Sequence, residues 1–212
     1  MTEFGITSYN ANSLKANKLI GPRFNFRNRS VIESYLASNY YVLIQEARLD
    51  DFSKEILKLK YNVVTSSAGS SLGGGLLIFA PFKLDQVFEI LDEGHLLALV
   101  TALPSGERVI IANLYGNPTS SKAKKKEFVS SIDEKLQQLT ERHPLAMLYV
   151  GGDINISLDT DLEVNLNFEN TVNNLGLVDA YRHIYPSATL HRGYTRFAYK
   201  GQNSHSGLHD QV

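Results

Sequence analysis

Short apolar runs recur along the chain, and most of them end in polar residues or in glycine. Runs such as VLIQ at residues 42–45 and LLIF at residues 76–79 lack any polar alternation. Strands with this pattern are typical of sheets covered on both faces. The predicted strands are FGITSYN, YYVLIQE, YNVVTSS, GGLLIFA, LDQVFEI, HLLALVTAL, RVIIANLY and MLYVGGD.

Helices are fewer, and the clearest one follows Ser120 and Ser121, either of which can cap it. Its apolar positions recur at helical spacing, and it is predicted to end near His143-Pro144. The apolar positions are Phe128, Val129, Ile132, Leu136 and Leu139. Shorter helices are predicted around residues 31–36 and 168–175.

The turn at Pro104-Ser105-Gly106 joins two predicted strands and indicates a hairpin. Frequent hairpin signals favour two packed mixed sheets with helices outside them over the rival architecture, a doubly wound parallel sheet. No linker, repeat or low-complexity segment interrupts the chain, so residues 1–212 are predicted to form a single α/β domain.

Composition excludes several classes of protein. The chain has no cysteine, which excludes disulfides and thiolate zinc sites and favours a reducing compartment. No window is apolar enough to span a bilayer, and the N-terminus MTEFGITSYN lacks the pattern of a secretory signal. We therefore expect an intracellular protein without a membrane segment.

The net charge of −1 argues against a generally basic surface, but basic residues gather in two places. Lys15, Lys18, Arg23, Arg27 and Arg29 follow the first strand, and Lys122, Lys124, Lys125 and Lys126 form a second run. Such runs are commonly solvated faces. The first run is more suggestive of binding because it follows a strand with polar residues at its end.

Polar side chains stand at the ends of four predicted strands. The first strand ends at Asn10 with Asn12 beyond it, and the second ends at Gln45-Glu46. Two later strands end at Tyr115 and at Gly151-Gly152-Asp153-Ile154-Asn155. Each group alone is typical of a turn or of a satisfied buried polar group. Four strands ending in this way predict a common active-site rim.

The rim suits metal-assisted cleavage of a phosphodiester. A glutamate that no neighbouring cation neutralises, as expected for Glu46, is a natural ligand for Mg²⁺. Asp153 could orient or deprotonate an attacking water, Asn155 could hold that water or the phosphate, and Tyr115 could bond a phosphate oxygen. With oxygen ligands and no cysteine, Mg²⁺ or Mn²⁺ is favoured over zinc.

The stretches SYNAN, LIQEARL, ANLYGNP, GGDINIS and YTRF, in that order, resemble the endonuclease/exonuclease/phosphatase superfamily of metal-dependent phosphodiesterases. The resemblance extends from Ile6 to Asp210 and implies a four-layered α/β sandwich. It implies Glu46 as the principal metal ligand, with Asn10 and Asn12 beside the metal and phosphate. It also implies Tyr115 as a phosphate contact, Asp153 as the group that activates water, and Asn155 as a phosphate or water contact.

The passage NLGLVDAYRHIYPSATLHRGYTRF is similar to two branches of that superfamily. One is the endonuclease domain of LINE-type (non-LTR) retrotransposons, which nicks target DNA, and the other is the apurinic/apyrimidinic repair endonucleases. QEARL favours the retrotransposon branch. That branch implies double-stranded DNA as substrate, a polyprotein with reverse transcriptase, and access to the nucleus. Arg23, Arg27, Arg29, Lys122 and Arg196 are the candidate DNA contacts.

The chain departs from the superfamily at its C-terminal end. Relatives end with a Ser-Asp-His motif that acts on the scissile phosphate, whereas this sequence stops at LHDQV. Asp210 resembles the orienting partner of that missing histidine. We expect a C-terminal strand to be missing and the chain to be truncated, with weak cleavage as a consequence. The alternatives are another phosphodiesterase of the superfamily and a catalytically impaired domain that binds nucleic acid.

Overall fold

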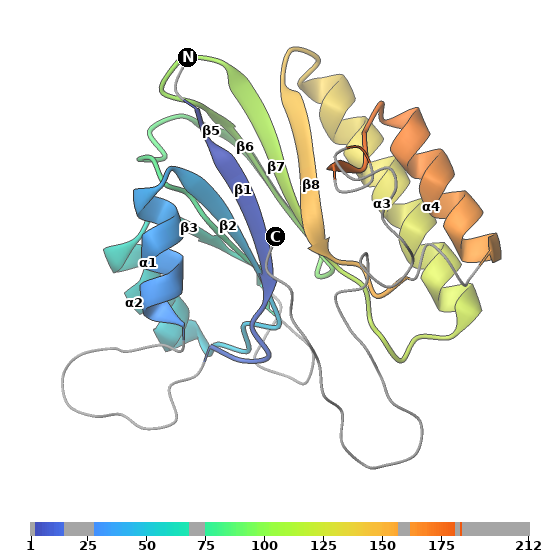
Figure 1. The fold of residues 1–212 in the computed structure, drawn as a ribbon, viewed down its shortest axis with the longest axis horizontal. Helices are drawn as coiled ribbons and strands as arrows, with labels where there is room; N and C mark the ends of the chain where they lie inside the picture. The colour runs from blue at the N-terminus through green and yellow to red at the C-terminus, as the bar shows by residue number, and fades with distance from the viewer. Residues whose placement is uncertain (1–2, 15–27, 68–74, 157–161, 181–182, 184–212) are drawn as a thin grey trace. The chain divides into compact units, whose positions relative to one another are not determined.

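The computed structural model describes residues 3–14, 28–67, 75–156, 162–180 and 183 (Figure 1). The chain divides into two compact units, Met1–Ile156 and Ser157–Val212. The first unit carries both sheets and the helices α1 to α3, and the second carries α4. The single domain expected for residues 1–212 stays a prediction.

Sheet A contains β1 (Gly5–Asn10), β2 (Tyr40–Gln45), β3 (Val63–Thr65) and β4 (Leu77–Phe79) in the order β1-β2-β4-β3. β1 and β2 are parallel, and their last residues, Asn10 and Gln45, are paired. The carboxyl ends of these two strands therefore meet at one edge of the sheet.

Sheet B contains β5 (Val87–Asp92), β6 (Leu96–Ala102), β7 (Arg108–Tyr115) and β8 (Met147–Asp153) in the order β5-β6-β7-β8. The predicted hairpin is confirmed, since β6 and β7 are antiparallel neighbours. β7 and β8 are parallel, and Tyr115 pairs with Asp153. A second pair of strand ends is thus brought into register.

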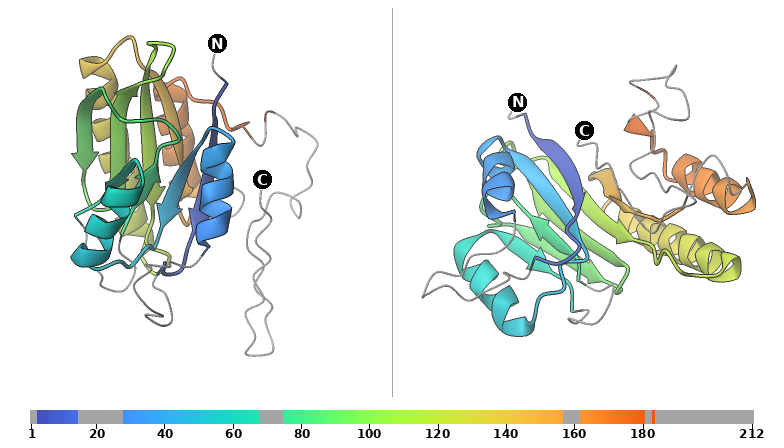
Figure 2. Two further views of the ribbon diagram at one scale, coloured as in Figure 1. Left: turned by 90° about the vertical axis from the view of Figure 1, so that its left-hand side faces the viewer. Right: turned by 60° about the horizontal axis from the view of Figure 1, so that its bottom comes forward.

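Three helices cover the two sheets of the first unit. α1 (Arg29–Ala37) and α2 (Asp51–Lys60) lie on the outer face of sheet A, and α3 (Lys122–Arg142) lies against sheet B (Figures 1 and 2). Ser121 caps α3 by accepting a hydrogen bond from the backbone N–H of Lys124, as the sequence predicted. α2 was not predicted. Its cap is Asp50, whose side chain accepts from the N–H of Ser53.

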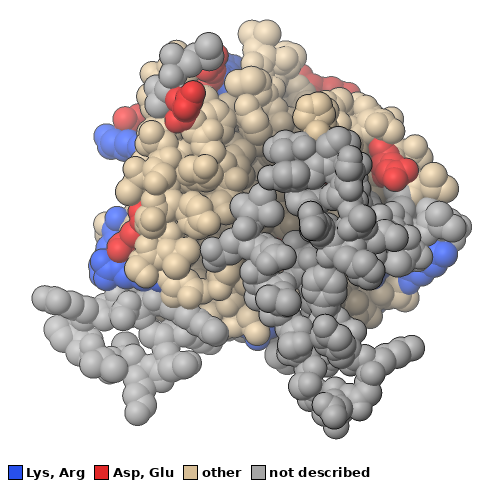
Figure 3. Space-filling view, viewed as in Figure 1, with Lys and Arg blue, Asp and Glu red and all other residues tan. Residues whose placement is uncertain are grey.

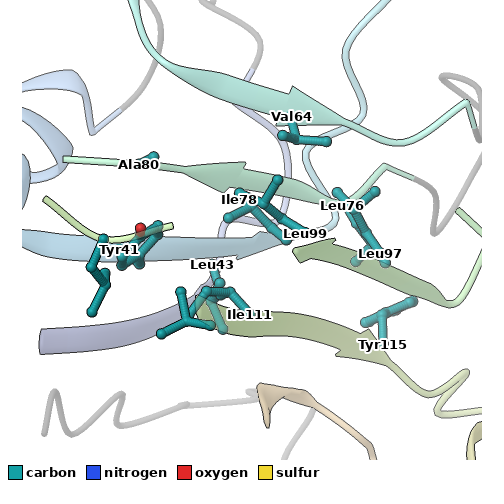
Figure 4. Packing of buried hydrophobic residues seen from close by; sticks show 12 residues of the cluster. Tyr41, Leu43, Val64, Leu76, Ile78, Ala80, Leu97, Leu99, Ile111 and Tyr115 are labelled. Carbon is teal, nitrogen blue, oxygen red and sulfur yellow. The ribbon is translucent and has the colours of Figure 1, made fainter. Parts of the chain in front are cut away.

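Two apolar clusters hold these layers together. Ile32 of α1 and Leu57 of α2 pack with Val42, Ile44 and Phe79 of sheet A. The second cluster lies between the sheets and joins Leu43 and Ile78 of sheet A to Leu97, Leu99 and Ile111 of sheet B (Figure 4). β2 and β4 contribute to both clusters, which explains why their sequences show no polar alternation.

The architecture predicted from the sequence, two packed mixed sheets with helices outside, is confirmed. The layers of the first unit run from α1 and α2 through sheet A and sheet B to α3 (Figure 2). None of the helices in the described ranges is long and apolar enough to cross a bilayer. The expectation that a C-terminal strand is missing stays a prediction.

α4 (Leu162–Asn174) belongs to the second unit and begins earlier than the sequence predicted. It ends in a Schellman motif. The N–H of Leu177 donates to the carbonyl of Val172, and the N–H of Gly176 donates to that of Asn173. Gly176 has a φ of 64°, the left-handed conformation that this cap requires.

Candidate active site

Asn10 joins the strand ends of the two sheets. Its Nδ2 donates to Glu46 Oε1 at 3.0 Å and to Asp153 Oδ2 at 2.9 Å. Glu46 directly follows β2 of sheet A, and Asp153 ends β8 of sheet B. One neutral amide thus holds two carboxylates close together, although they are 107 positions apart in the sequence (46 and 153).

Both oxygens of Glu46 have partners in this network. Oε1 also accepts from the hydroxyl of Tyr115 at 2.8 Å, and Oε2 is paired with a guanidinium nitrogen of Arg48. Burial raises the pKa of the Glu46 carboxyl, but the hydrogen bonds from Asn10, Tyr115 and Arg48 together outweigh burial, so that its pKa is lowered. Glu46 is therefore held as a carboxylate.

Tyr115 is buried at the end of β7 (Figure 4). Burial and the hydrogen bond to Glu46 raise the pKa of its phenol. Tyr115 consequently stays protonated at neutral pH and acts as a hydrogen-bond donor.

Asn155 lies in the loop after β8 and contacts the residue that follows Tyr115. Its backbone N–H donates to Asp153 Oδ1 at 3.2 Å, and its Nδ2 donates to the carbonyl of Gly116 at 2.7 Å. Lys125 of α3 donates to the carbonyl of Asn155 at 3.1 Å. The loop after β8 is thus anchored to the loop after β7 and to the first turn of α3.

Left-handed backbone conformations gather at this rim. Among non-glycine residues, Glu46, Arg48 and Asn155 have φ values of 51°, 48° and 50°. Asn12 and Ser13 follow β1 with φ values of 42° and 87°. Residues in this region cost free energy and cluster at functional sites. Hydrogen bonds from the N–H groups of Ser13 and Leu14 to the carbonyls of Glu46 and Ala47 hold the two loops side by side.

The glycines of GGDIN allow the strands to approach one another. A Cβ on Gly152, whose φ is 138°, would lie 2.1 Å from the carbonyl oxygen of Leu114 in β7. A Cβ on Gly151 would lie 2.7 Å from Leu43 Cδ1 in sheet A, and one on Gly116 would lie 1.9 Å from the carbonyl oxygen of Ile154. Gly152 and Gly116 thus allow two backbone segments to lie close together, and Gly151 allows β8 to lie close to sheet A.

A buried amide pair lies directly beneath the rim. Gln45 Nε2 donates to Asn113 Oδ1 at 2.6 Å, and Asn113 Nδ2 donates to the carbonyls of Ile44 and Leu77 at 2.9 Å each. Both side chains are fully buried. Since Asn113 belongs to β7 and its three partners belong to sheet A, these bonds fix the separation of the sheets below Glu46 and Tyr115.

One argument from the sequence is wrong: Glu46 does have a neighbouring cation. Arg48, two residues later, pairs with Glu46 Oε2. The sequence offered the signal, since QEAR places the arginine at the second position after the glutamate. The pairing depends on the left-handed turns at 46 and 48, which a sequence pattern does not reveal.

The other predicted site residues fall into three groups. Asn12 lies at the rim with its side chain exposed, and its N–H donates to Asn10 Oδ1. Arg29 begins α1 and pairs with Glu33 at 2.7 Å, while Lys122 begins α3. Arg23, Arg27, Arg196 and Asp210 lie outside the described residues. All the predicted roles remain predictions.

Four residues that the structure connects to the rim were given no role there from the sequence. These are Arg48, which pairs with Glu46, Lys125, which bonds the Asn155 carbonyl, and the buried pair of Gln45 and Asn113. Gln45 and Asn113 did carry a signal, because each is an amide inside an otherwise apolar strand.

The donor set suits a hard divalent cation. Glu46, Asp153 and Asn10 offer only oxygen ligands, and within the described ranges no group of three or more histidine, aspartate or glutamate side chains is placed to hold a metal ion by itself. Mg²⁺ commonly binds to one or two carboxylates, keeps several waters and takes substrate phosphate as a further ligand. The residues present therefore fit such an ion.

No protein-family model and no curated protein sequence matches the chain. Solved structures match it in fold. The human Nocturnin catalytic domain with bound sulfate anion is 19% identical, with 85% of this chain and 74% of that chain covered and a TM-score of 0.54. D. rerio TDP2 complexed with single strand DNA product is 16% identical, with 98% and 81% covered and a TM-score of 0.50.

TDP2 from C. elegans is 16% identical, with 74% of this chain and 48% of that chain covered and a TM-score of 0.50. Nocturnin and TDP2 belong to the endonuclease/exonuclease/phosphatase superfamily. The chain therefore has an α/β fold of the kind found in that superfamily.

Proposed function

We propose that this chain is a divalent-cation-dependent phosphodiesterase that cleaves DNA. The observation that carries the proposal is the network in which Asn10 and Tyr115 hold Glu46, and Asn10 also holds Asp153. Apolar packing alone does not call for two carboxylates, an amide and a phenol at the meeting point of two sheets. Hydrolysis of a phosphodiester does call for such groups.

In the proposed reaction a water attacks phosphorus, the proton of that water passes to Asp153, the bond from phosphorus to the leaving oxygen breaks, and the leaving oxygen takes up a proton from solvent water. Asp153 is held for this task by the Asn10 amide and the Asn155 N–H. Glu46 would hold the cation, with Asn10 beside it, and the cation when bound would supply positive charge that stabilises the phosphate oxygens. Tyr115, whose hydroxyl donates to Glu46 in this structure, would turn its one proton to a phosphate oxygen when the substrate binds.

The finer assignment is a target-site endonuclease of a non-LTR retrotransposon, acting on double-stranded DNA in the nucleus as part of a polyprotein with reverse transcriptase. The order of SYNAN, LIQEARL, ANLYGNP and GGDINIS supports it. A neighbour in fold, D. rerio TDP2, was solved with a single strand DNA product, which supports DNA as the substrate class.

The test is nicking of supercoiled plasmid with the protein in excess and Mg²⁺ or Mn²⁺ present. We expect slow nicking that a chelator abolishes and that Asp153→Asn and Glu46→Gln each reduce by at least about 10²-fold. Asp51→Asn is the matched control, because Asp51 is an exposed carboxylate in α2. Its variant should nick at the wild-type rate.

Two results would contradict the proposal. One is the absence of nicking under all these conditions, and the other is activity that survives in both Glu46→Gln and Asp153→Asn. Duplexes with and without an abasic site, tested in parallel, separate the branches: faster cleavage of the abasic duplex would favour a repair endonuclease over the retrotransposon assignment.

A further inference from the structure

Arg48 uses only part of its guanidinium in its contact with Glu46. One terminal nitrogen is paired with Glu46 Oε2. The Nε of Arg48 is buried and has no hydrogen-bond partner, the one such side-chain atom in the described ranges. A buried donor without an acceptor costs on the order of 1–3 kcal/mol. The contact thus leaves the arginine incompletely satisfied.

Arg48 occupies Glu46 Oε2, which a cation bound at Glu46 would also need. Glu46 Oε1 is shared by the neutral donors Asn10 and Tyr115, so Oε2 is the oxygen held by charge. A guanidinium and a divalent cation at one carboxylate compete for the same negative charge and repel each other. Glu46 can serve one of them well, but not both.

A phosphate offers Arg48 a better partner. The Nε–H and a terminal N–H of arginine form a rigid fork that matches two oxygens of a phosphate. Arg48 lies beside Glu46, at the rim where the proposed reaction puts the scissile phosphate. Transfer to phosphate would give Nε the acceptor that it lacks in the described structure.

We propose that Arg48 is an exchangeable counter-ion: it holds Glu46 in the metal-free protein and moves to the substrate phosphate when a divalent cation binds at Glu46. The inference rests on the proposed function, because it takes Glu46 as the cation ligand. It makes Arg48 a specificity-determining residue for phosphate. It also couples the two ligands, since a bound phosphate keeps the guanidinium away from Glu46 and so favours the cation.

The test measures Mn²⁺ binding by electron paramagnetic resonance of the free ion, with and without thymidine 5′-monophosphate. In Arg48→Gln we expect Mn²⁺ to bind about three- to tenfold tighter without the nucleotide, because the competing guanidinium is gone. We expect the nucleotide to bind the Mn²⁺-loaded variant about tenfold more weakly than it binds the wild type.

Two further variants make the result specific. Arg48→Lys keeps the charge without the fork, so it should retain wild-type Mn²⁺ affinity and lose affinity for the nucleotide. Arg108→Gln removes the same charge at the far end of β7, where Arg108 lies over the Phe88 ring, and should change neither affinity. Thermal melting followed by circular dichroism confirms that each variant is folded.

The inference is overturned if Arg48→Gln binds Mn²⁺ no more tightly than the wild type does, or if both Arg48 variants keep wild-type affinity for the nucleotide. Arg48 would then only support Glu46. A different result addresses the proposed function itself. If Glu46→Gln binds Mn²⁺ as well as the wild type, Glu46 is no cation ligand and the metal site is wrong, whatever Arg48 does.

Discussion

At the scale of single residues, Gly152 shows how closely β8 approaches β7. Its φ of 138° is unfavourable for other residues, and a Cβ there would meet the backbone of Leu114 at 2.1 Å. Gly106 also has a positive φ, 89°, but a Cβ there would meet nothing within 4 Å. A substitution at Gly106 therefore measures the cost of the backbone conformation alone, whereas one at Gly152 adds the cost of steric overlap.

We expect Gly152→Ala to destabilise the protein by more than about 3 kcal/mol, because it combines backbone strain with overlap of backbone atoms. Gly106→Ala should cost only the conformational strain, about 1–2 kcal/mol. Urea unfolding followed by circular dichroism measures both. Equal losses in the two variants would mean that β8 can move away from β7 at little cost.

Tyr115 is the second residue whose role can be isolated. Tyr115→Phe removes one of the hydrogen bonds that lower the pKa of Glu46, so the pKa of Glu46 should rise. Loss of the donor to phosphate should reduce nicking by about 10²-fold. The acid limb of the pH–rate profile should also move to higher pH, because Glu46 takes up its proton earlier as the pH falls. An unchanged limb would show that Glu46 ionisation does not control the rate.

At the scale of elements, the sequence predicted all eight strands and the main helix, because short apolar runs mark the strands and apolar residues at helical spacing mark α3. α2 was not predicted, although it has a capping aspartate and i,i+3 ion pairs. Its apolar residues Phe52 and Leu59 are exposed, so the apolar positions in its sequence do not all fall on one helical face. The rim could be predicted from strand ends alone. The partnership of Glu46 with Arg48 could not, because it depends on left-handed turns that tertiary packing imposes.

The amide pair of Gln45 and Asn113 connects elements of the two sheets. Asn113→Ala should destabilise the protein by on the order of 3 kcal/mol, since it leaves Gln45 and two backbone carbonyls without their donor or acceptor. The double variant with Gln45→Ala should lose less than the sum of the single variants, as expected for groups in one network. If the losses of unfolding free energy measured by chemical denaturation are additive, Gln45 and Asn113 do not act as one network between the sheets.

Glu89 connects β5 to the end of α3. It accepts two hydrogen bonds from Arg142 and one at 2.8 Å from His143, and the hydrogen bond from Arg142 is the main reason that the pKa of Glu89 is lowered. A carboxyl whose pKa is lowered in the folded state stabilises the fold at any pH above its ordinary pKa of 4.5. That stability is lost as the pH falls through the lowered pKa.

The difference in stability between the wild type and Glu89→Gln should accordingly be about 0.5–1 kcal/mol at pH 7 and should vanish well below pH 4. Melting temperatures across pH 3–7 measure it. Asp85→Asn, which removes an exposed carboxylate paired with Lys83, is the control and should show a smaller change. A gap that persists at the lowest pH would mean that Glu89 acts through packing instead of charge.

At the scale of the whole molecule, positive and negative charges are nearly balanced. The chain has 21 basic and 22 acidic residues, so long-range attraction to DNA is weak. On the face shown in Figure 3, the basic and acidic residues of the described ranges are few and lie toward the edges of the view. If the chain binds DNA as proposed, the attraction has to come from local groups, and Lys125 in the first turn of α3 lies next to the rim, where it bonds the Asn155 carbonyl.

Lys124 tests this local contribution without disturbing Lys125. If its ammonium contacts a phosphate, Lys124→Gln should weaken duplex binding and reduce the slope of log K against log salt concentration by about 0.9. Lys83→Gln, at an exposed position before β5, removes the same charge and should leave the slope unchanged. Fluorescence anisotropy with a labelled duplex in Ca²⁺, over about 50–200 mM salt, gives both slopes. Equal slopes for Lys124→Gln and the wild type would exclude this part of α3 from the DNA interface, and binding would then have to be sought along the other edges of the rim.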